Sequence, residues 1–398
     1  MDSSLLIIML SSSVLISYGF DLVSSRTKLP SVVLLLATGM LIRQATDYFG
    51  IAIPFVNVIL PTLGTLGLIL IVLEGGLDLE LSGGKHRLIG RTFVAALLGI
   101  LLSMFAIAGI FYVLLGEKFY NALVTATPFA IISSAVAIPS VRGLSEKPRE
   151  FMVYESSLSD IIGLMIFNIL VIPAGSGWES AFQFVKSTVL VVIISVICCF
   201  LLLYLISRIN HHVKYLPIIS TLFIVYAVGK MYHLSSLLAI LVFGLFLNNT
   251  ELFVRGKLKN YLKNDLFETE LEQFKKLNAE SAFVIRTFFF LIFGYSTNIG
   301  ELVDIDAWIV SMLLVLAMIG TRYISLKATF KGNMKPILYV APRGLITVLL
   351  FLSIPPQYLV VGFRDGILMI TVILTALMMM VAVMSHKPEE EERLEDVP

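Results

Sequence analysis

The stretch YESSLSDIIGLMIFNILVI, residues 154–172, is apolar enough to cross a membrane and yet carries two carboxylates, Glu155 and Asp160. About 20 mainly apolar residues in a helix span the ~30 Å hydrocarbon core of a bilayer. A charged side chain at the bilayer centre costs about 2.5–3.5 kcal/mol on insertion scales, so such residues usually pair or serve a function. The stretch therefore predicts a membrane helix that carries a buried polar site.

The composition of the whole chain indicates the same class of protein. Of its 398 residues, 58% are hydrophobic and 14% are charged, whereas about 25% of the residues in a typical soluble domain are charged. Cys198 and Cys199 are adjacent in an apolar run, which is not the spacing of a disulfide framework or a metal site. The net charge of +1 and the lack of a basic arm give no reason to expect a nucleic-acid partner. We therefore expect an all-α polytopic membrane protein.

Apolar runs bounded by Gly, Pro and charged residues divide the chain into about 13 transmembrane helices. Twelve or fourteen spans are the alternatives, because the runs near residues 220 and 240 are short and closely joined. The predicted spans are 3–20, 30–49, 54–77, 89–115, 119–140, 150–172, 183–207, 215–230, 233–248, 281–298, 304–326, 334–353 and 363–385.

Lysine and arginine residues distribute unevenly between the loops that alternate along these spans. One side collects 22 of the 29, and the other side has five. Cytoplasmic loops of membrane proteins carry an excess of positive residues. The pattern predicts an N-terminus outside and a C-terminus in the cytoplasm, which requires an odd number of spans. Thirteen spans satisfy this requirement.

Two segments outside the predicted spans contain many charged residues. Residues 249–280 mix charges with spaced Leu, Tyr and Phe, which predicts an amphipathic helix at the cytoplasmic surface. Residues 386–398, HKPEEEERLEDVP, form an acidic cytoplasmic tail. Residues 1–385 are expected to form the membrane transporter domain.

Helical geometry places the polar residues of the stretch 154–172 on one face. At ~100° per residue, Glu155 and Ser159 lie on one line, and Ser156 and Asp160 lie on the neighbouring line. Hydroxyl and carboxylate oxygens are hard ligands that suit a small cation. The alternatives are that the serines only permit close helix packing and that Glu155 only neutralises an arginine. We favour an ion-binding function for Asp160 and leave both interpretations of Glu155 open.

Two of the predicted spans contain signals that break a helix. The span 119–140 carries Pro128 and Pro139 among several hydroxyl residues, and the span 334–353 contains Pro342-Arg343-Gly344. Proline removes a backbone donor and clashes with the preceding turn. The two spans are seven apart and so run in opposite directions. Paired interrupted helices of this kind predict two inverted repeats with two broken, crossing helices and a site near the midplane.

Four short motifs follow one another along the chain: LEGGLDLE at 73–80, TATP at 125–128, ESSLSD at 155–160 and PRGLITV at 342–348. Together they resemble the monovalent cation:proton antiporter superfamily, in its sodium/proton exchanger branch. ESSLSD is similar to that branch's Glu-Ser-x-x-Asn-Asp motif, and TATP stands where Thr-Asp-Pro marks the broken helix. The other two resemble the Gly-Leu-acidic element of the third span and the Arg-Gly span. The resemblance covers essentially the whole membrane region.

The resemblance implies a role for individual residues of the site. Asp160 would carry the proton or the cation, Ser156 would be a cation ligand, and Thr127 would offer its backbone carbonyl. Two residues depart from the family's pattern, because Ser159 stands in place of Asn or Asp and Thr127 stands in place of the aspartate of Thr-Asp-Pro. Ser159 remains a candidate ligand through its hydroxyl.

Glu155 would pair with an arginine across the core. Arg322 lies deep in the span 304–326 and is the favoured partner, and Arg343 at the second break is the alternative. The resemblance further implies a homodimer with a mobile core domain, which we expect from spans 89–172 and 281–353, and a dimerisation domain from the remaining spans.

We therefore predict an antiporter, not an enzyme, that exchanges a monovalent cation for a proton by alternating access. One free carboxylate favours electroneutral exchange, with Na⁺ as the favoured cation and K⁺ or Li⁺ as alternatives. We expect no resident cofactor, since the cation and the proton are the substrates, and a lipid environment in a prokaryotic cytoplasmic membrane. The alternative functions are a cation channel or uniporter and an organic-anion:sodium symporter of similar architecture.

Overall fold

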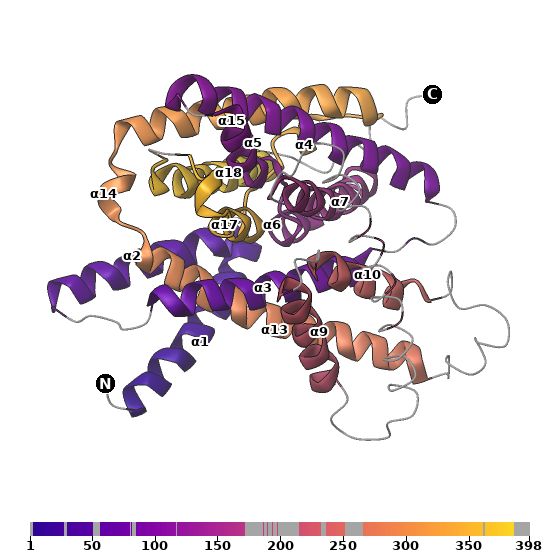
Figure 1. The fold of residues 1–398 in the computed structure, drawn as a ribbon. Helices are drawn as coiled ribbons and strands as arrows, with labels where there is room; N and C mark the ends of the chain where they lie inside the picture. The colour runs from indigo at the N-terminus through magenta and orange to yellow at the C-terminus, as the bar shows by residue number, and fades with distance from the viewer. Residues whose placement is uncertain are drawn as a thin grey trace. The chain divides into compact units, whose positions relative to one another are not determined.

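The computed structural model is helical throughout the residues that it describes, and no strand occurs among them (Figure 1). These residues are 3–27, 30–50, 56–79, 81, 85–116, 118–171, 215–231, 236–250, 266–360 and 363–385, with the single positions 186, 189, 193 and 197. The predicted span 183–207 with its two cysteines, the acidic tail and residues 251–265 of the predicted amphipathic segment lie almost entirely outside this set.

Ten longer helices coincide with predicted spans. Within the described ranges, seven helical segments are long and apolar enough to cross a membrane, which confirms a polytopic membrane protein. The ten helices are α1 (Ser3–Thr27), α2 (Ser31–Tyr48), α3 (Val56–Asp78), α4 (His86–Leu115), α7 (Glu146–Val171), α9 (Tyr215–Met231), α10 (Ser236–Asn248), α13 (Leu266–Ser296), α15 (Ile305–Thr329) and α18 (Asp365–Ser385).

Local signals account for where several of these helices begin and end. The side chain of Asp304 accepts a hydrogen bond from the amide of Asp306 and so caps the start of α15. Asn298 caps the four-residue helix α14 (Ile299–Leu302) in the same way. Gly116 follows α4 with a φ of 67°, a left-handed conformation that ends a helix at little cost for glycine.

Two predicted spans are broken, as their prolines and glycine indicate. The span 119–140 consists of α5 (Phe119–Ala130) and α6 (Ser134–Ser140), which are separated by a short extended segment. The span 334–353 consists of α16 (Lys335–Leu338) and α17 (Leu345–Leu352), with an irregular segment between them. We call these segments, residues 131–133 and 339–344, the first break and the second break.

The helix α13 is longer than the span predicted for it. It runs without interruption over 31 residues, although the sequence suggested an amphipathic segment up to residue 280 and a separate span from residue 281. The described part of the amphipathic segment is therefore a helical extension of that span.

Contacts divide the chain into two compact units. The first comprises Met1–Gly64, Gly90–Gly163 and Val284–Pro398, and the second comprises Thr65–Ile89 and Leu164–Phe283. Both broken helices belong to the first unit. The division into a core domain and a dimerisation domain stays a prediction.

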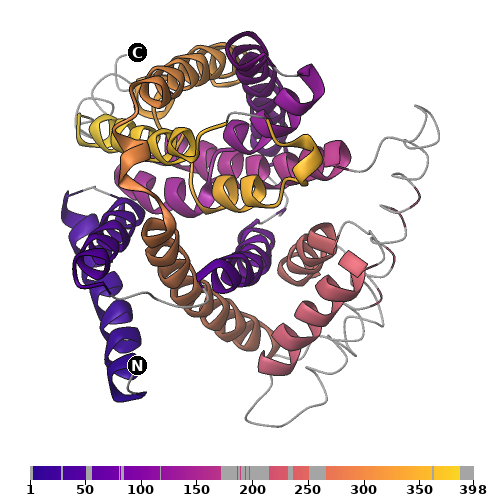
Figure 2. The same ribbon diagram turned by 60° about the vertical axis from the view of Figure 1, so that its left-hand side comes forward.

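In the first unit, α4 and α15 lie side by side, as two views agree (Figure 1, Figure 2). The hydroxyls of Ser103 and Thr321 are 2.7 Å apart, and the hydroxyl of Ser325 donates to the carbonyl of Ala95 at 2.8 Å. All four residues are small or short, which lets the two backbones approach closely. This contact holds α15 in the position from which Arg322 reaches the interior.

An aromatic cluster in the first unit holds the end of α5. The ring of Phe129 is fully buried and lies 6.0–6.1 Å from the rings of Phe111, Phe351 and Phe363, mostly edge to face. Such aromatic pairs contribute about 0.5–1.5 kcal/mol each beyond their burial. The cluster therefore fixes the last turn of α5 directly before the first break.

In the second unit, α3 and α10 cross at two glycines. A Cβ atom on Gly76 would lie 2.8 Å from the carbonyl of Leu241, and one on Gly244 would lie 2.8 Å from the carbonyl of Leu73. Beyond the crossing, the side chain of Asn249 donates to the carbonyl of Leu79 at 2.8 Å and satisfies the end of α3.

Candidate functional site

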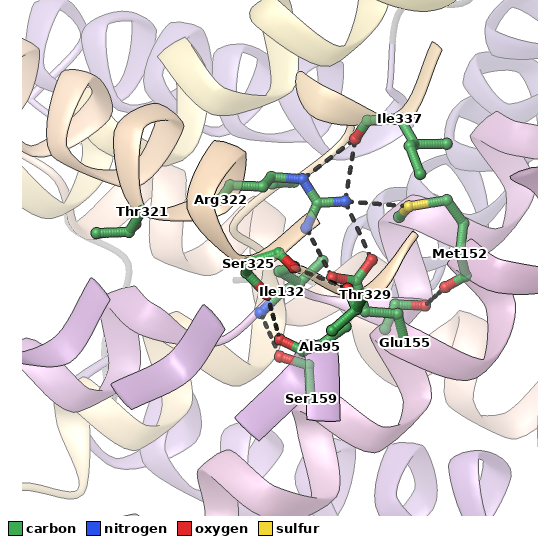
Figure 3. Close-up of polar contacts among 12 residues, drawn as sticks. Ala95, Ile132, Met152, Glu155, Ser159, Thr321, Arg322, Ser325, Thr329 and Ile337 are labelled. Carbon is green, nitrogen blue, oxygen red and sulfur yellow. Dashed lines mark hydrogen bonds and ion pairs between the residues drawn. The ribbon is translucent and has the colours of Figure 1, made fainter. Parts of the chain in front are cut away.

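The first break leaves backbone amides without an acceptor in their own helix. Two consecutive side chains of α7 accept hydrogen bonds from them. The amide of Ile132 donates to the hydroxyl of Ser159 at 3.0 Å, and the amide of Ser134 donates to Oδ2 of Asp160 at 3.1 Å. Ser159 points directly at Ile132 in the close-up (Figure 3). A buried amide without an acceptor would cost about 1–3 kcal/mol. The polar motif of α7 thus has a structural task at the break as well as any chemical one.

The two breaks contact each other through their backbones. The amide of Ser133, between the two amides bound by α7, donates to the carbonyl of Pro342 at 3.0 Å. Gly344 makes this approach possible, because a Cβ atom there would lie 2.6 Å from the hydroxyl oxygen of Ser133 and 2.9 Å from its Cβ. The segments that the sequence predicts to be broken therefore meet at one place.

A second glycine, Gly163, brings α7 against the first break. A Cβ atom on Gly163 would overlap the side chain of Ile131. Gly163 follows Asp160 by three residues and so lies close to its face of the helix. The absence of a side chain at this position lets α7 approach closely enough for Asp160 to reach the amide of Ser134.

Asp160 is a buried carboxylate with one oxygen unused. Its Oδ2 accepts a hydrogen bond from the amide of Ser134, and Oδ1 is buried without a partner in the part of the chain that the structure describes. The residue as a whole is 8% exposed. A buried charge without compensation is strongly unfavourable, so the ionised form of this carboxyl group costs free energy unless its charge is compensated. The hydroxyl oxygen of Ser133 is a second buried oxygen without a partner in the same range.

Ser156 and Thr127 are buried, and both hydroxyl protons are already donated within their own helices. The hydroxyl of Ser156 donates to the carbonyl of Met152 at 2.7 Å, and that of Thr127 donates to the carbonyl of Leu123 at 2.8 Å. Their oxygen atoms keep lone pairs that a cation could share. The structure brings Ser159 and Asp160 together at the first break, and it gives no hydrogen bond from Ser156 or Thr127 to Asp160.

Glu155 lies opposite Arg322. Nη1 of the arginine lies 3.1 Å from Oε1 of Glu155, and Nη2 lies 3.1 Å from Oε2, which is a bidentate pair between buried side chains (Figure 3). Nε and Nη2 of Arg322 also donate to the carbonyl of Ile337 at 3.1 and 3.0 Å, and Nη2 contacts the sulfur of Met152. Both carboxylate oxygens of Glu155 and all three guanidinium nitrogens of Arg322 thus have hydrogen-bond partners, and the pair joins α7, α15 and α16.

Arg343, the alternative partner of Glu155, binds main-chain carbonyls instead. Its Nε donates to the carbonyl of Phe129 at 2.5 Å and its Nη1 to the carbonyl of Ala341 at 3.1 Å. The carbonyl of Phe129 belongs to the last turn of α5, where the helix dipole favours a positive charge. The amide of Arg343 donates to the hydroxyl of Thr375 on α18 at 3.0 Å.

Sequence reasoning missed Thr375 and the carbonyl of Phe129. Thr371 and Thr375 stand four residues apart in an otherwise apolar span, which places two hydroxyls on one helical face. That spacing was a usable signal for Thr375. The carbonyl of Phe129 had no signal of its own, because any residue in the last turn of a broken helix presents one.

Comparisons with known proteins bear on the function of this arrangement. The model of the family described as sodium/hydrogen exchanger, transmembrane, matches residues 10–387. The chain belongs to the sodium/hydrogen exchanger family. This exchanger is therefore an integral membrane protein of a family that exchanges cations for protons.

Solved structures of similar fold include two of a sodium proton antiporter. The structure of the sodium proton antiporter MjNhaP1 from Methanocaldococcus jannaschii at pH 8 superposes with a TM-score of 0.68 at 17% identity, over 96% of this chain and 99% of that one. An electron-microscopy map of the same protein gives a TM-score of 0.68 at 16% identity, over 100% and 99% of the two chains. At this identity the likeness shows the fold alone. A search of curated proteins found no match.

Proposed function

We propose that the protein exchanges one monovalent cation for one proton by competition at the carboxylate of Asp160. The observation that carries the proposal is the state of this side chain, which is buried and has one oxygen without a protein partner among the described residues. Burial disfavours the ionised form. A proton and a cation are the two species that can neutralise the group, and they exclude each other.

The remaining ligands would come from the residues around the first break. We assign the hydroxyl oxygens of Ser156 and Ser159 and the backbone carbonyl of Thr127 to the cation together with Asp160. All are oxygen ligands, as hard cations prefer. We favour Na⁺, with Li⁺ and K⁺ as competitors that an assay must rank, and no resident cofactor enters this scheme.

The pairing of the second carboxylate supports a one-for-one exchange. Both oxygens of Glu155 face Arg322 at 3.1 Å, and the pair is neutral. Asp160 is then the one buried carboxylate of the break that can gain and lose a proton during a cycle. Exchange of one proton for one monovalent cation moves no net charge and is electroneutral.

Alternating access follows from the cost of moving a charge. An empty, ionised Asp160 is expensive to carry through a low-dielectric interior, whereas a protonated or cation-bound Asp160 is not. Only the neutralised site then changes its exposure from one side of the membrane to the other. This makes exchange obligatory and separates an antiporter from a channel.

Proteoliposomes test the proposal directly. Proton flux driven by a Na⁺, Li⁺ or K⁺ gradient should be lost in Asp160→Asn, while Asp47→Asn, a mostly exposed carboxylate near the end of α2, retains it. A membrane potential set with K⁺ and valinomycin in a Na⁺ assay should leave the rate unchanged. Normal exchange by Asp160→Asn would overturn the assignment, and a potential-driven flux would overturn electroneutrality.

We also propose that the protein functions in regulating pH as a homodimer in a prokaryotic cytoplasmic membrane. The placement of 22 of 29 Lys and Arg residues on one side supports an N-terminus outside and a C-terminus in the cytoplasm. Labelling of a cysteine introduced at either end by a membrane-impermeant reagent checks the orientation.

A further inference from the structure

Arg343 is a buried guanidinium with an unused donor group. It is 3% exposed, and none of the described carboxylates lies within ion-pair distance of it. An arginine carries five N–H donors. Nε and Nη1 donate to two carbonyls, whereas Nη2 has no protein acceptor within the described ranges. A donor on a side chain that is only 3% exposed is costly unless it finds an acceptor.

A small cavity lies beside this group in the first unit. Its volume is about 10 Å³, and its polar wall includes Arg343, Glu155 and Ser159. The opposite wall is formed by small residues of α4, among them Ala96 and Gly99. A space of roughly 10–15 Å³ holds one water when two to four polar groups surround it.

We propose that this cavity binds one water molecule that bridges the ion pair to Arg343. The water accepts hydrogen bonds from Nη2 of Arg343 and from the hydroxyl of Ser159, whose oxygen already accepts from the amide of Ile132. It donates to the carboxylate of Glu155, which has lone pairs beyond those that face Arg322. A halide is the competing occupant, because Arg322 lines the cavity together with Arg343 and Glu155, and the bromide soak described below tests for it.

The bridging water connects elements that carry the two breaks. It extends the pair of Arg322 and Glu155 to Arg343 and, through that side chain, to the carbonyl of Phe129 at the end of α5. It is a structural ligand that holds Arg343 in place. The inference does not depend on the transport activity, so its tests and those of the proposed function fail independently.

A methyl group in the cavity tests the proposal. A Cβ atom on Gly99 would lie 3.7 Å from the hydroxyl oxygen of Ser325 and meet no other atom of a neighbouring element within 4 Å. Replacing glycine by alanine inside a helix normally stabilises. We expect Gly99→Ala to do the opposite and lower the melting temperature by about 2–4 °C, because displacing the water leaves donors of Arg343 unsatisfied.

Gly109 provides the matched control on the same helix. A Cβ atom there meets no neighbouring atom within 4 Å, so Gly109→Ala should keep or raise the melting temperature. The variant Gly99→Ser separates water loss from crowding, because its hydroxyl can take the place of the water. We expect Gly99→Ser to be more stable than Gly99→Ala, the reverse of their helix propensities. If Gly99→Ala stabilises as the control does, the proposal is wrong.

A high-resolution map of the wild-type protein gives the second measurement and needs no variant. It should show a density peak at hydrogen-bond distance from Nη2 of Arg343 and from Glu155. A bromide soak followed by an anomalous map should show no peak at that place. An anomalous peak in the cavity, or no density in a map that resolves other buried waters, would overturn the assignment of a water.

Discussion

Both broken helices leave backbone amides without an acceptor in their own helix, but the charged side chain found at each break has the opposite sign. At the first break, α7 supplies Ser159 and Asp160 as acceptors for two buried amides that have no acceptor within their own helix. At the second break, α18 supplies Thr375 as the acceptor for the amide of Arg343. In both cases the acceptors come from the next span along the chain, α7 after the first broken helix and α18 after the second. The first break thus gains a carboxylate, whereas the second gains a hydroxyl and carries an arginine of its own.

Both charges act on the first broken helix. Asp160 binds the amide of Ser134 at the start of α6, and Arg343 binds the carbonyl of Phe129 at the end of α5. These are the signs that the partial charges of helix ends favour. The arginine is committed to carbonyls, and it leaves one oxygen of Asp160 unpartnered among the described residues. The difference between the breaks therefore supports the proposal that the exchange site lies at the first one.

The largest loss of stability is expected when the ion pair of Glu155 and Arg322, next to the first break, is broken. Glu155→Gln leaves Arg322 buried without its counter-charge, which costs about 3–5 kcal/mol of stability. Asp160→Asn, five residues later on the same helix, should lose exchange and keep the melting temperature of the wild type. Thermal unfolding in detergent measures both variants.

Replacing both members of the pair separates charge from packing. Glu155→Leu combined with Arg322→Met removes both charges, and it should recover most of the stability that Glu155→Gln loses. If Glu155→Gln is as stable as the wild type, or if Asp160→Asn is the variant that unfolds, the two carboxylates have been assigned the wrong roles.

A smaller loss of stability is expected from a substitution that separates the two breaks. Gly344→Ala places a methyl group 2.6 Å from the hydroxyl oxygen of Ser133, and overpacking of this kind costs about 1–3 kcal/mol. Exchange should slow as well, because the amide of Ser133 loses its alignment with Pro342. The control is Gly320→Ala on α15, where a Cβ atom meets no neighbour within 4 Å.

The crowding explanation of Gly344→Ala has its own test. Adding Ser133→Gly removes both atoms of Ser133 that the new methyl group would touch, and it should restore part of the lost stability. A double variant that is less stable than either single one would show that the breaks do not meet at this pair.

The sequence predicted the positions of the breaks because their causes are local. Pro128 lies in the last turn of α5, directly before the first break, and Pro342-Arg343-Gly344 lies in the second. Helical periodicity placed Glu155 with Ser159 and Ser156 with Asp160. The periodicity did not reveal that the hydroxyl of Ser156 donates back to Met152. It also left Arg322 and Arg343 as alternatives for Glu155, because the choice depends on distances between helices that are remote in the chain.

The inverted repeat stays a prediction, but glycine crossings agree with it. In the first unit α2 and α13 approach closely at Gly39 and Gly294, and in the second unit α3 and α10 do so at Gly76 and Gly244. If the second break is the counterpart of the first, seven spans later, then α2 corresponds to α10 and α3 to α13. The crossing of α2 with α13 then corresponds to that of α10 with α3.

The smallest loss of stability is expected when a hydroxyl that accepts a hydrogen bond from an amide of either break is removed. Ser159→Ala and Thr375→Val each leave one buried amide without an acceptor, that of Ile132 or that of Arg343, and each should lose about 1 kcal/mol of stability. Only Ser159→Ala should also weaken the apparent affinity for the cation, since Thr375 is not among its ligands. Sodium titrations of proton flux in the two variants measure this difference. Equal changes in affinity would mean that the second break contributes to the cation site as much as the first. The two breaks would then differ in their hydrogen-bond acceptors and not in their part in cation binding.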